Sequence, residues 1–203
     1  LDEEHRPKWD AARRLLTRQR LLPRGQFSAE RIDIQLIFEE TFGDRFSPPP
    51  QAVQQLLHEW AIAIDEALVA RMPWDRVGVN EILHLVTTGQ SSRAADLLES
   101  QYEHNRAVRS NNLETAEAIA DELGPDASAR WTEAVLNKAF PSIYRRDAID
   151  ALIDYLQIEL TTPEPSENEL STIAALRSLH EQYQLERQPI RETLRTLQLD
   201  SEG

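Results

Sequence analysis

Cysteine is absent from the whole 203-residue chain. Its absence excludes a disulfide framework, a thiolate nucleophile and a zinc site with sulfur ligands. Because small secreted scaffolds usually depend on disulfides, we expect a cytoplasmic protein. The sequence shows no signal-peptide pattern, and whether a leader preceded Leu1 is left open.

Glycine is also scarce, with six residues, of which one ends the chain. Few glycines mean few tight turns and few places where a backbone closely approaches a ligand, which disfavours sheet-rich folds. The phosphate-binding patterns GxGxxG and GxxxxGK(S/T) are absent, as is the nucleophile elbow GxSxG. We therefore expect no nucleotide bound by a known type of loop, and no cofactor.

Long apolar runs are missing too. No stretch approaches the roughly 20 apolar residues that a membrane-spanning helix needs, so we expect no membrane partner. No stretch of six residues bounded by turn signals alternates clearly between apolar and polar side chains, so we predict no significant β-sheet.

Helical periodicity, by contrast, is present along almost the whole sequence. The strongest example follows the prolines Pro48–Pro50 and ends at Pro73, and its apolar residues recur every three or four positions: Val53, Leu56, Leu57, Trp60, Ile64, Ala67 and Leu68. The sequence predicts an all-α protein. We expect an irregular multi-helix bundle of about nine or ten helices, with stacked helical hairpins as the alternative.

Capping residues and prolines set the expected helix boundaries. Ser28 is the expected N-cap of a helix that ends near Phe42, and Asn112 is the expected N-cap of another. Ser166 and Glu169 have the spacing of a capping box. Pro189 is expected to begin a last short helix.

The expected organisation is a main helical domain over residues 1–160 and a C-terminal helical hairpin over residues 166–203. The residues between them, Thr161–Pro165, contain two prolines and are the linker candidate. The hairpin is either separate or packed on the same core. We expect that core to come from the helices in residues 48–71, 112–123, 142–160 and 166–184.

Charge is distributed unevenly along the chain. Residues 1–24 hold seven basic and four acidic residues, a net charge of +3, whereas the whole chain carries −13. The remaining residues therefore carry −16. A basic opening segment on an acidic body points towards a partner or towards the body itself.

This opening segment, residues 1–24, is predicted to form a basic amphipathic helix. One side holds the apolar stripe Trp9, Ala12, Leu15, Leu16, Gln19 and Leu22. The opposite side carries Arg6, Arg13, Arg14, Arg18 and Arg20, and Arg24 lies at the end of the segment. Three interpretations of these arginines are open. They pair with the acidic body of the same chain, they bind an acidic protein partner, or they bind nucleic-acid phosphates.

Nucleic-acid binding has some local support. Residues 28–42 and the helix from Pro48 could form a helix-turn-helix unit, with an exposed recognition side of Gln51, Gln54, Gln55 and His58. Against this interpretation, the candidate recognition helix has no lysine or arginine, and the link between the helices is longer than usual for the motif. Nucleic acid is therefore not the favoured partner.

Metal binding rests on a single pair of residues. Glu81 and His84 are three positions apart on an expected helix, as in di-iron bundles, but a second such pair is missing. The favoured interpretation is a solvated Glu81 and a half-buried His84, without a metal. Asp147, Asp150 and Asp154 are expected to form a solvated acidic stripe, with a docking strip for a basic partner as the alternative.

By elimination, the sequence favours a non-enzymatic protein-interaction module, namely an adaptor, a regulator or an assembly subunit that acts through helical surfaces. The alternatives are a DNA-binding transcriptional regulator and a helical-bundle metal protein. A protein partner is expected, and a homo-oligomer is left open. Trp9, Trp60 and Trp131 are expected in the core, and Trp74 as an exposed anchor. The candidate binding residues are Arg6, Arg13, Arg14, Arg18, Arg20, Arg24 and Trp74.

Overall fold

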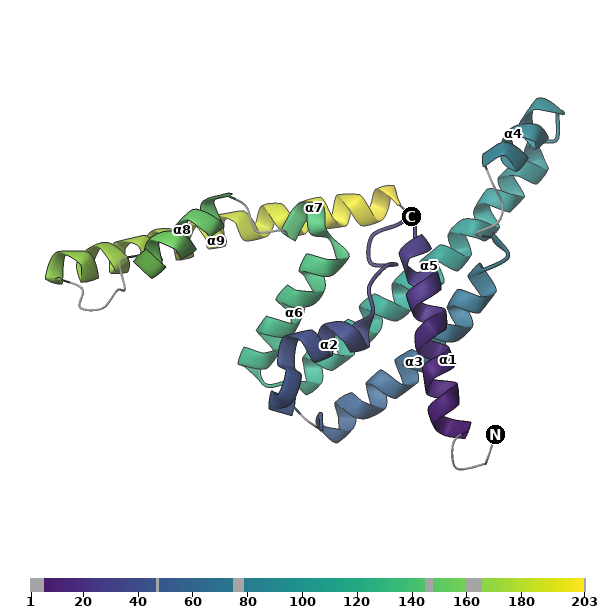
Figure 1. The fold of residues 1–203 in the computed structure, drawn as a ribbon. Helices are drawn as coiled ribbons and strands as arrows, with labels where there is room; N and C mark the ends of the chain where they lie inside the picture. Colours follow the sequence, from purple (N-terminus) through teal and green to yellow (C-terminus); the bar gives the residue numbers. More distant parts are fainter. Residues whose placement is uncertain (1–5, 47, 75–78, 145–147, 160–165, 203) are drawn as a thin grey trace. The chain divides into compact units, whose positions relative to one another are not determined.

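A computed structural model describes residues 6–46, 48–74, 79–144, 148–159 and 166–202 (Figure 1). Within these ranges the chain forms nine α-helices and two short 3₁₀ helices, and no strand. The predicted all-α fold is therefore confirmed. None of the helices in these ranges combines the length and the apolarity that crossing a membrane requires.

The helices divide into two compact units. Unit 1 consists of Leu1–Ala139 with Glu202–Gly203, and unit 2 consists of Phe140–Ser201. The expected linker, Thr161–Pro165, lies outside the described residues, so the domain boundary placed there stays a prediction.

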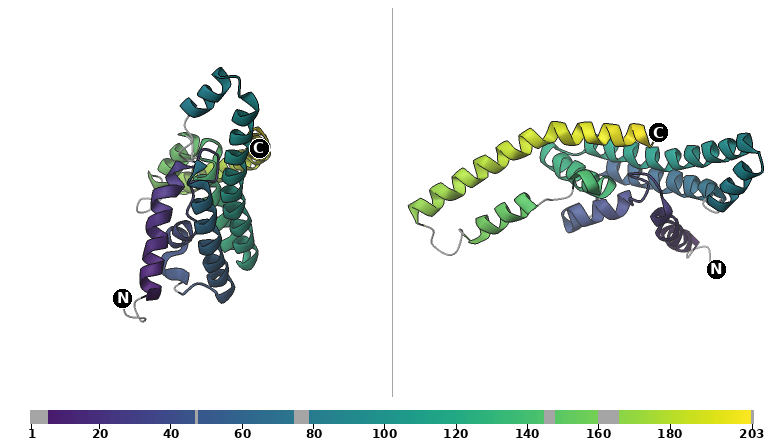
Figure 2. Two further views of the ribbon diagram at one scale, coloured as in Figure 1. Left: turned by 90° about the vertical axis from the view of Figure 1, so that its right-hand side faces the viewer. Right: turned by 90° about the horizontal axis from the view of Figure 1, so that it is seen from above.

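Unit 1 contains six of the α-helices and both 3₁₀ helices. In chain order they are α1 (Arg6–Leu21), η2 (Leu22–Arg24), α2 (Ile34–Phe42), η3 (Gly43–Phe46), α3 (Gln51–Arg71), α4 (Val79–Thr87), α5 (Ser91–Glu122) and α6 (Pro125–Ala139). Helices α3 and α5 lie side by side and form the centre of the unit (Figure 2). Around them, α1 packs on α3, α6 packs on α5, and α2 packs on α6.

The core of unit 1 follows the predicted stripe of α3. Trp60, Ile64 and Leu68 are at most 2% exposed. Trp131 of α6 is also fully buried, and its indole ring lies edge-on to Phe38 of α2, with 5.7 Å between the ring centroids. The prediction that Trp60 and Trp131 belong to the core is confirmed.

Residues 91–122 form one continuous helix, α5, so the predicted N-cap at Asn112 is wrong. Asn112 lies in the middle of that helix and is fully buried. Its Nδ2 donates to the carbonyl of Ala29 over 2.7 Å, and its Oδ1 accepts from Trp60 Nε1 over 2.9 Å. A buried amide must find partners, and here both are far away in sequence.

Helix α2 begins at Ile34, so the predicted N-cap at Ser28 is also wrong. The observed N-cap is Asp33, whose carboxylate accepts from the backbone N–H of Leu36 over 3.1 Å. Residues 25–33 instead form a loop that we call the anchor loop, in which Ala29 has a positive φ of 63°. Glu30 closes this loop by accepting from the N–H of Gln26 over 2.6 Å.

Unit 2 contains α7 (Pro141–Tyr144), α8 (Ala148–Glu159) and α9 (Glu167–Ser201). The capping box at the start of α9 is confirmed, because Ser166 and Glu169 each accept from the backbone N–H of the other. Helix α9 then continues through Pro189 to Ser201, so the predicted break at this proline and the two-helix hairpin are wrong. Proline cannot donate to the carbonyl four residues earlier, which belongs to Leu185, a residue that is 75% exposed.

Asp150 of α8 is buried rather than solvated. It is only 5% exposed, whereas the sequence predicted a solvated stripe. Its carboxylate lies 3.2 Å from His180 Nε2 and 3.1 Å from Arg187 Nη1, and it accepts from the side-chain amide of Gln184. These bonds hold α8 against α9. The structure does not describe the side chains of Asp147 and Asp154.

Candidate functional site

Helix α1 packs on the body of unit 1 with an arginine at the centre of the contact. Arg18 is 4% exposed, and its guanidinium carbon lies 5.0 Å from the centre of the Trp60 ring. Its two terminal nitrogens donate to Gln35 Oε1 over 3.4 and 3.5 Å. A desolvated cation over an indole face is a favourable contact. Arg18 therefore has a partner within its own chain.

Arg14 faces the body in the same way. Its Nε lies 3.7 Å from the Asp65 carboxylate. Burial raises the pKa of Asp65, and the charges of Arg18 and Arg14 oppose that rise. The acidic body therefore takes up two of the candidate arginines, which corresponds to the first of the three interpretations of the basic helix.

Most of the apolar stripe of α1, in contrast, is exposed, whereas Leu22 at its end lies in η2 and is buried. Trp9 is 57% exposed, Leu15 44% and Leu16 64%. The expectation that Trp9 belongs to the core is therefore wrong. The surface that α1 covers explains this arrangement, because it presents the Trp60 ring together with the carboxylates of Asp33 and Asp65. Such a surface favours arginine over leucine.

A groove of about 680 Å³ lies between α1, α2, η3 and α3. Ala12 and Leu15 continue the apolar stripe of α1 into it. The opposite walls supply further apolar surface from Phe38, Phe46, Leu57 and Ala61. Polar atoms come from Arg14, Arg18, Gln35, Glu39, Gln54 and His58. We call the exposed side chains of Trp9, Leu15 and Leu16 together with this groove the α1 surface.

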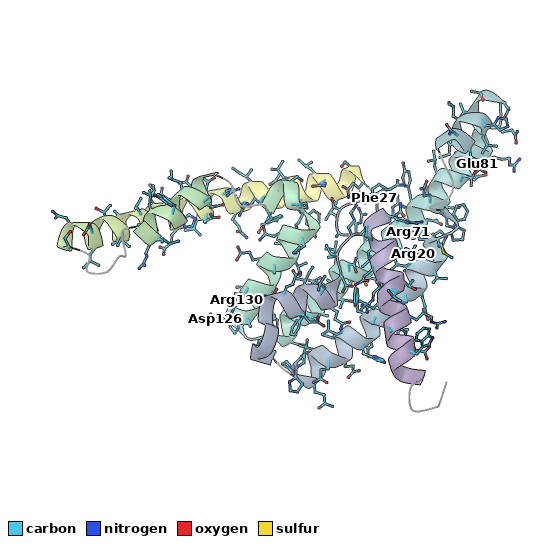
Figure 3. All side chains as sticks on the ribbon, viewed as in Figure 1. Arg20, Phe27, Arg71, Glu81, Asp126 and Arg130 are labelled. Carbon is cyan, nitrogen blue, oxygen red and sulfur yellow. The ribbon has the colours of Figure 1, made fainter. Side chains whose placement is uncertain are left out.

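The remaining candidate arginines lie further from the body. Arg13 is exposed and lies 3.7 Å from Asp10 of the same helix. Arg20, labelled in Figure 3, is exposed and its Nη2 lies 3.7 Å from the sulfur of Met72. Arg24 is exposed in η2, and the side chain of Arg6 lies outside the described residues.

A buried ion pair holds the end of α1 in place. Arg71 of α3 and Glu30 of the anchor loop are both fully buried, with 3.6 Å between Arg71 Nη1 and Glu30 Oε2. Arg71 also donates to the carbonyl of Leu21, the last residue of α1 (Figure 3 labels Arg71). At Gly25, a Cβ atom would lie 2.5 Å from Glu30 Cβ, so the anchor loop requires glycine at this position.

Burial raises the pKa of Glu30, while the N–H groups of Gln26 and Phe27 and the charges of Arg71 and Arg109 oppose that rise. Sequence reasoning missed this pair. Arg71 continues the spacing of the α3 stripe, three residues after Leu68, and that position was the available signal. No local pattern marks Glu30.

The residues proposed for other chemistries lie elsewhere in unit 1. Glu81 and His84 are both exposed on α4, and in the part of the chain that the structure describes no three His, Asp or Glu side chains gather as a metal site would require. Gln54 donates to the carbonyl of Pro49, and Gln55 donates to Glu59 over 2.8 Å. Trp74 is half-buried and stacks on His104, with 5.6 Å between the ring centroids.

No protein-family model matches this chain, and no curated protein or solved structure matches it at a significant level.

Proposed function

We propose that this chain is a non-enzymatic protein-interaction module, and that its α1 surface receives an amphipathic helix of a protein partner. The observation that carries the proposal is the orientation of α1. The helix turns Arg14 and Arg18 towards its own body and leaves Trp9, Leu15 and Leu16 exposed.

The exposed apolar side chains are a source of binding free energy. Full burial of a large apolar side chain contributes about 1.5–3 kcal/mol, and these three residues retain roughly half of that gain for a partner. Tryptophan is also among the residues that most often dominate protein interfaces. An unfilled apolar stripe that contains Trp9 is therefore suited to recognition.

The groove beside α1 has the composition of a helix-binding site. Leu15, Phe38 and Leu57 supply apolar walls, and Arg14 and His58 supply polar atoms at the same site. Helix-in-groove recognition uses apolar anchors spaced by about three or four residues along one side of the incoming helix. On α1, the apolar residues that border the groove, Ala12 and Leu15, are likewise three positions apart.

DNA binding remains the alternative. It gains little from the described side chains, because Arg14 and Arg18 face the body, and the amides of Gln54 and Gln55 already donate within the chain.

The test is affinity capture with a matched pair of variants in a lysate of the source organism. Leu16→Glu places a charge on the α1 surface, whereas Leu83→Glu places one on α4, where Leu83 is 57% exposed. We expect the wild type and Leu83→Glu to retain a stoichiometric protein partner that Leu16→Glu loses, with unchanged thermal unfolding of both variants. A partner that stays bound to Leu16→Glu, or no stoichiometric partner of the wild type, would overturn the proposal.

A further inference from the structure

Helix α9 turns polar side chains towards the other helices of unit 2. His180, Gln184 and Arg187 all contact the buried carboxylate of Asp150 in α8. Further along, the guanidinium of Arg191 lies 5.6 Å from the centre of the Tyr144 ring in α7. The contacts within unit 2 therefore use charge and hydrogen bonds along much of this helix.

A second side of α9 is apolar and exposed. Leu179 and Ile190 are each 60% exposed, Leu194 is 48% exposed and Leu197 is 58% exposed. At 100° per residue these four side chains fall within about 60° of one another around the helix. They form one stripe, which we call the α9 stripe, about 27 Å long.

The α9 stripe continues an interface that is already in use. Ile190, Leu194 and Leu197 are the last members of a series that starts at Ile173 and alternates steps of three and four residues, as in a coiled coil. The series also includes His180 and Arg187, whereas Leu179 lies next to it. At the start of the series Ile173 is buried, at 4% exposure, and further along His180 and Arg187 contact Asp150 of α8. Helix α8 has only 12 residues and α9 has 35, so the series runs on beyond α8.

The charge of this part of α9 indicates which partner binds the α9 stripe. Residues 179–197 carry three acidic and three basic residues and are neutral overall, in a chain of net charge −13: Glu181, Glu186, Glu192, Arg187, Arg191 and Arg195. Two copies of so acidic a protein repel one another over most of their surface. In a neutral segment this repulsion is weak, so the apolar stripes of two copies can pair with each other.

We infer that the α9 stripe is a self-association site, and that its occupant is a second copy of this chain paired through the same stripe. The inference does not depend on the proposed function of the α1 surface, because the two surfaces lie on different helices. A stripe of this length buries a small area, so the dimer is weak and forms as protein concentration rises.

The test is sedimentation equilibrium of the full chain from low to high micromolar concentration. We expect the mass to rise from 23.3 kDa towards twice that value. Because apolar contacts hold the dimer, we expect high salt to preserve it. A wild type that stays monomeric at every concentration, or a dimer that dissociates in high salt, would overturn the inference.

Variants on the same helix locate the interface. Leu194→Glu and Leu197→Glu place like charges opposite each other in a symmetric dimer, and we expect both to remain at 23.3 kDa. The matched control is Leu185→Glu, since Leu185 is 75% exposed and lies about 140° around the helix from Ile190. Far-UV circular dichroism confirms that each variant keeps its helical content. If both stripe variants still dimerise, or if Leu185→Glu loses the dimer to the same extent, the α9 stripe is not the dimer interface.

Discussion

Helices α1 and α3 are neighbours in unit 1 and both are amphipathic, yet they bury different kinds of side chain. Helix α3 buries its apolar stripe, with Trp60, Ile64 and Leu68 at most 2% exposed. Helix α1 buries Arg18 together with Leu21 and exposes Trp9 and Leu16.

The difference shows that an amphipathic pattern alone does not decide which side of a helix faces the body. The surface that a helix meets also decides it. Helix α3 packs against α5, in which Val108 and Ile119 are fully buried. Helix α1 meets Trp60 and Asp65, which stabilise a guanidinium more than they stabilise a leucine.

The largest effect is expected at Arg71, where α3 itself buries a charge. Arg71→Met leaves the buried Glu30 carboxylate without its cation, which costs about 3–5 kcal/mol of unfolding free energy at neutral pH. Urea unfolding measures this loss. A loss below about 1 kcal/mol, as is usual for an exposed ion pair, would show that the pair does not hold the anchor loop to α3.

The same variant has a predicted pH dependence. Burial raises the pKa of Glu30 above its ordinary value of 4.5. The protonated carboxyl group therefore contributes to the free energy of unfolding at acid pH, and this contribution is lost as pH rises through the raised pKa. Arg71 opposes this rise, so removing it raises the pKa further. The destabilisation of Arg71→Met should therefore be largest near neutral pH and shrink as pH falls towards 4.5. If the difference in unfolding free energy between variant and wild type stays constant from neutral pH down to about 4.5, this predicted pH dependence is wrong.

The next largest effect compares one apolar residue from each helix. Ile64→Ala in α3 opens a cavity in the core and should cost about 2–5 kcal/mol. Leu16→Ala in α1 removes an exposed side chain and should change stability by less than about 0.5 kcal/mol. Thermal or urea unfolding of the two variants measures both values. A similar cost at both positions would remove the distinction between the two helices.

A smaller effect compares two arginines of α1. Arg18→Ala removes the cation over Trp60 and should cost about 2 kcal/mol, because the contact is desolvated. Arg13→Ala removes an exposed side chain whose ion pair is worth at most about 1 kcal/mol. Equal effects of the two substitutions would mean that Arg18 is not buried against the body.

The sequence predicts the fold class and the core of α3, because helical periodicity and apolar spacing are local properties. It does not predict the length of α5 or α9. Asn112 and Pro189 are strong local signals for helix ends. In the folded chain, however, contacts with Trp60 and Ala29 satisfy the buried amide of Asn112, and α9 continues through Pro189.

The candidate site shows the same limit. The sequence singles out the arginines of α1 and their stripe, but it cannot assign their orientation. Arg18 meets Trp60 from 42 positions away, and Glu30 meets Arg71 from 41 positions away. Such contacts exist only once the chain is folded, so spacing within one helix does not show them.

The orientation of α1 is the central claim, and thiol labelling tests it most directly. Because the chain has no cysteine, Leu16→Cys and Leu21→Cys each introduce a single thiol, one on the exposed stripe and one at 1% exposure. We predict that the thiol of Leu16→Cys reacts with a soluble maleimide about as fast as in the unfolded protein, and that the thiol of Leu21→Cys is protected until the helix opens. A protected thiol at position 16 beside a reactive one at position 21 would contradict the account.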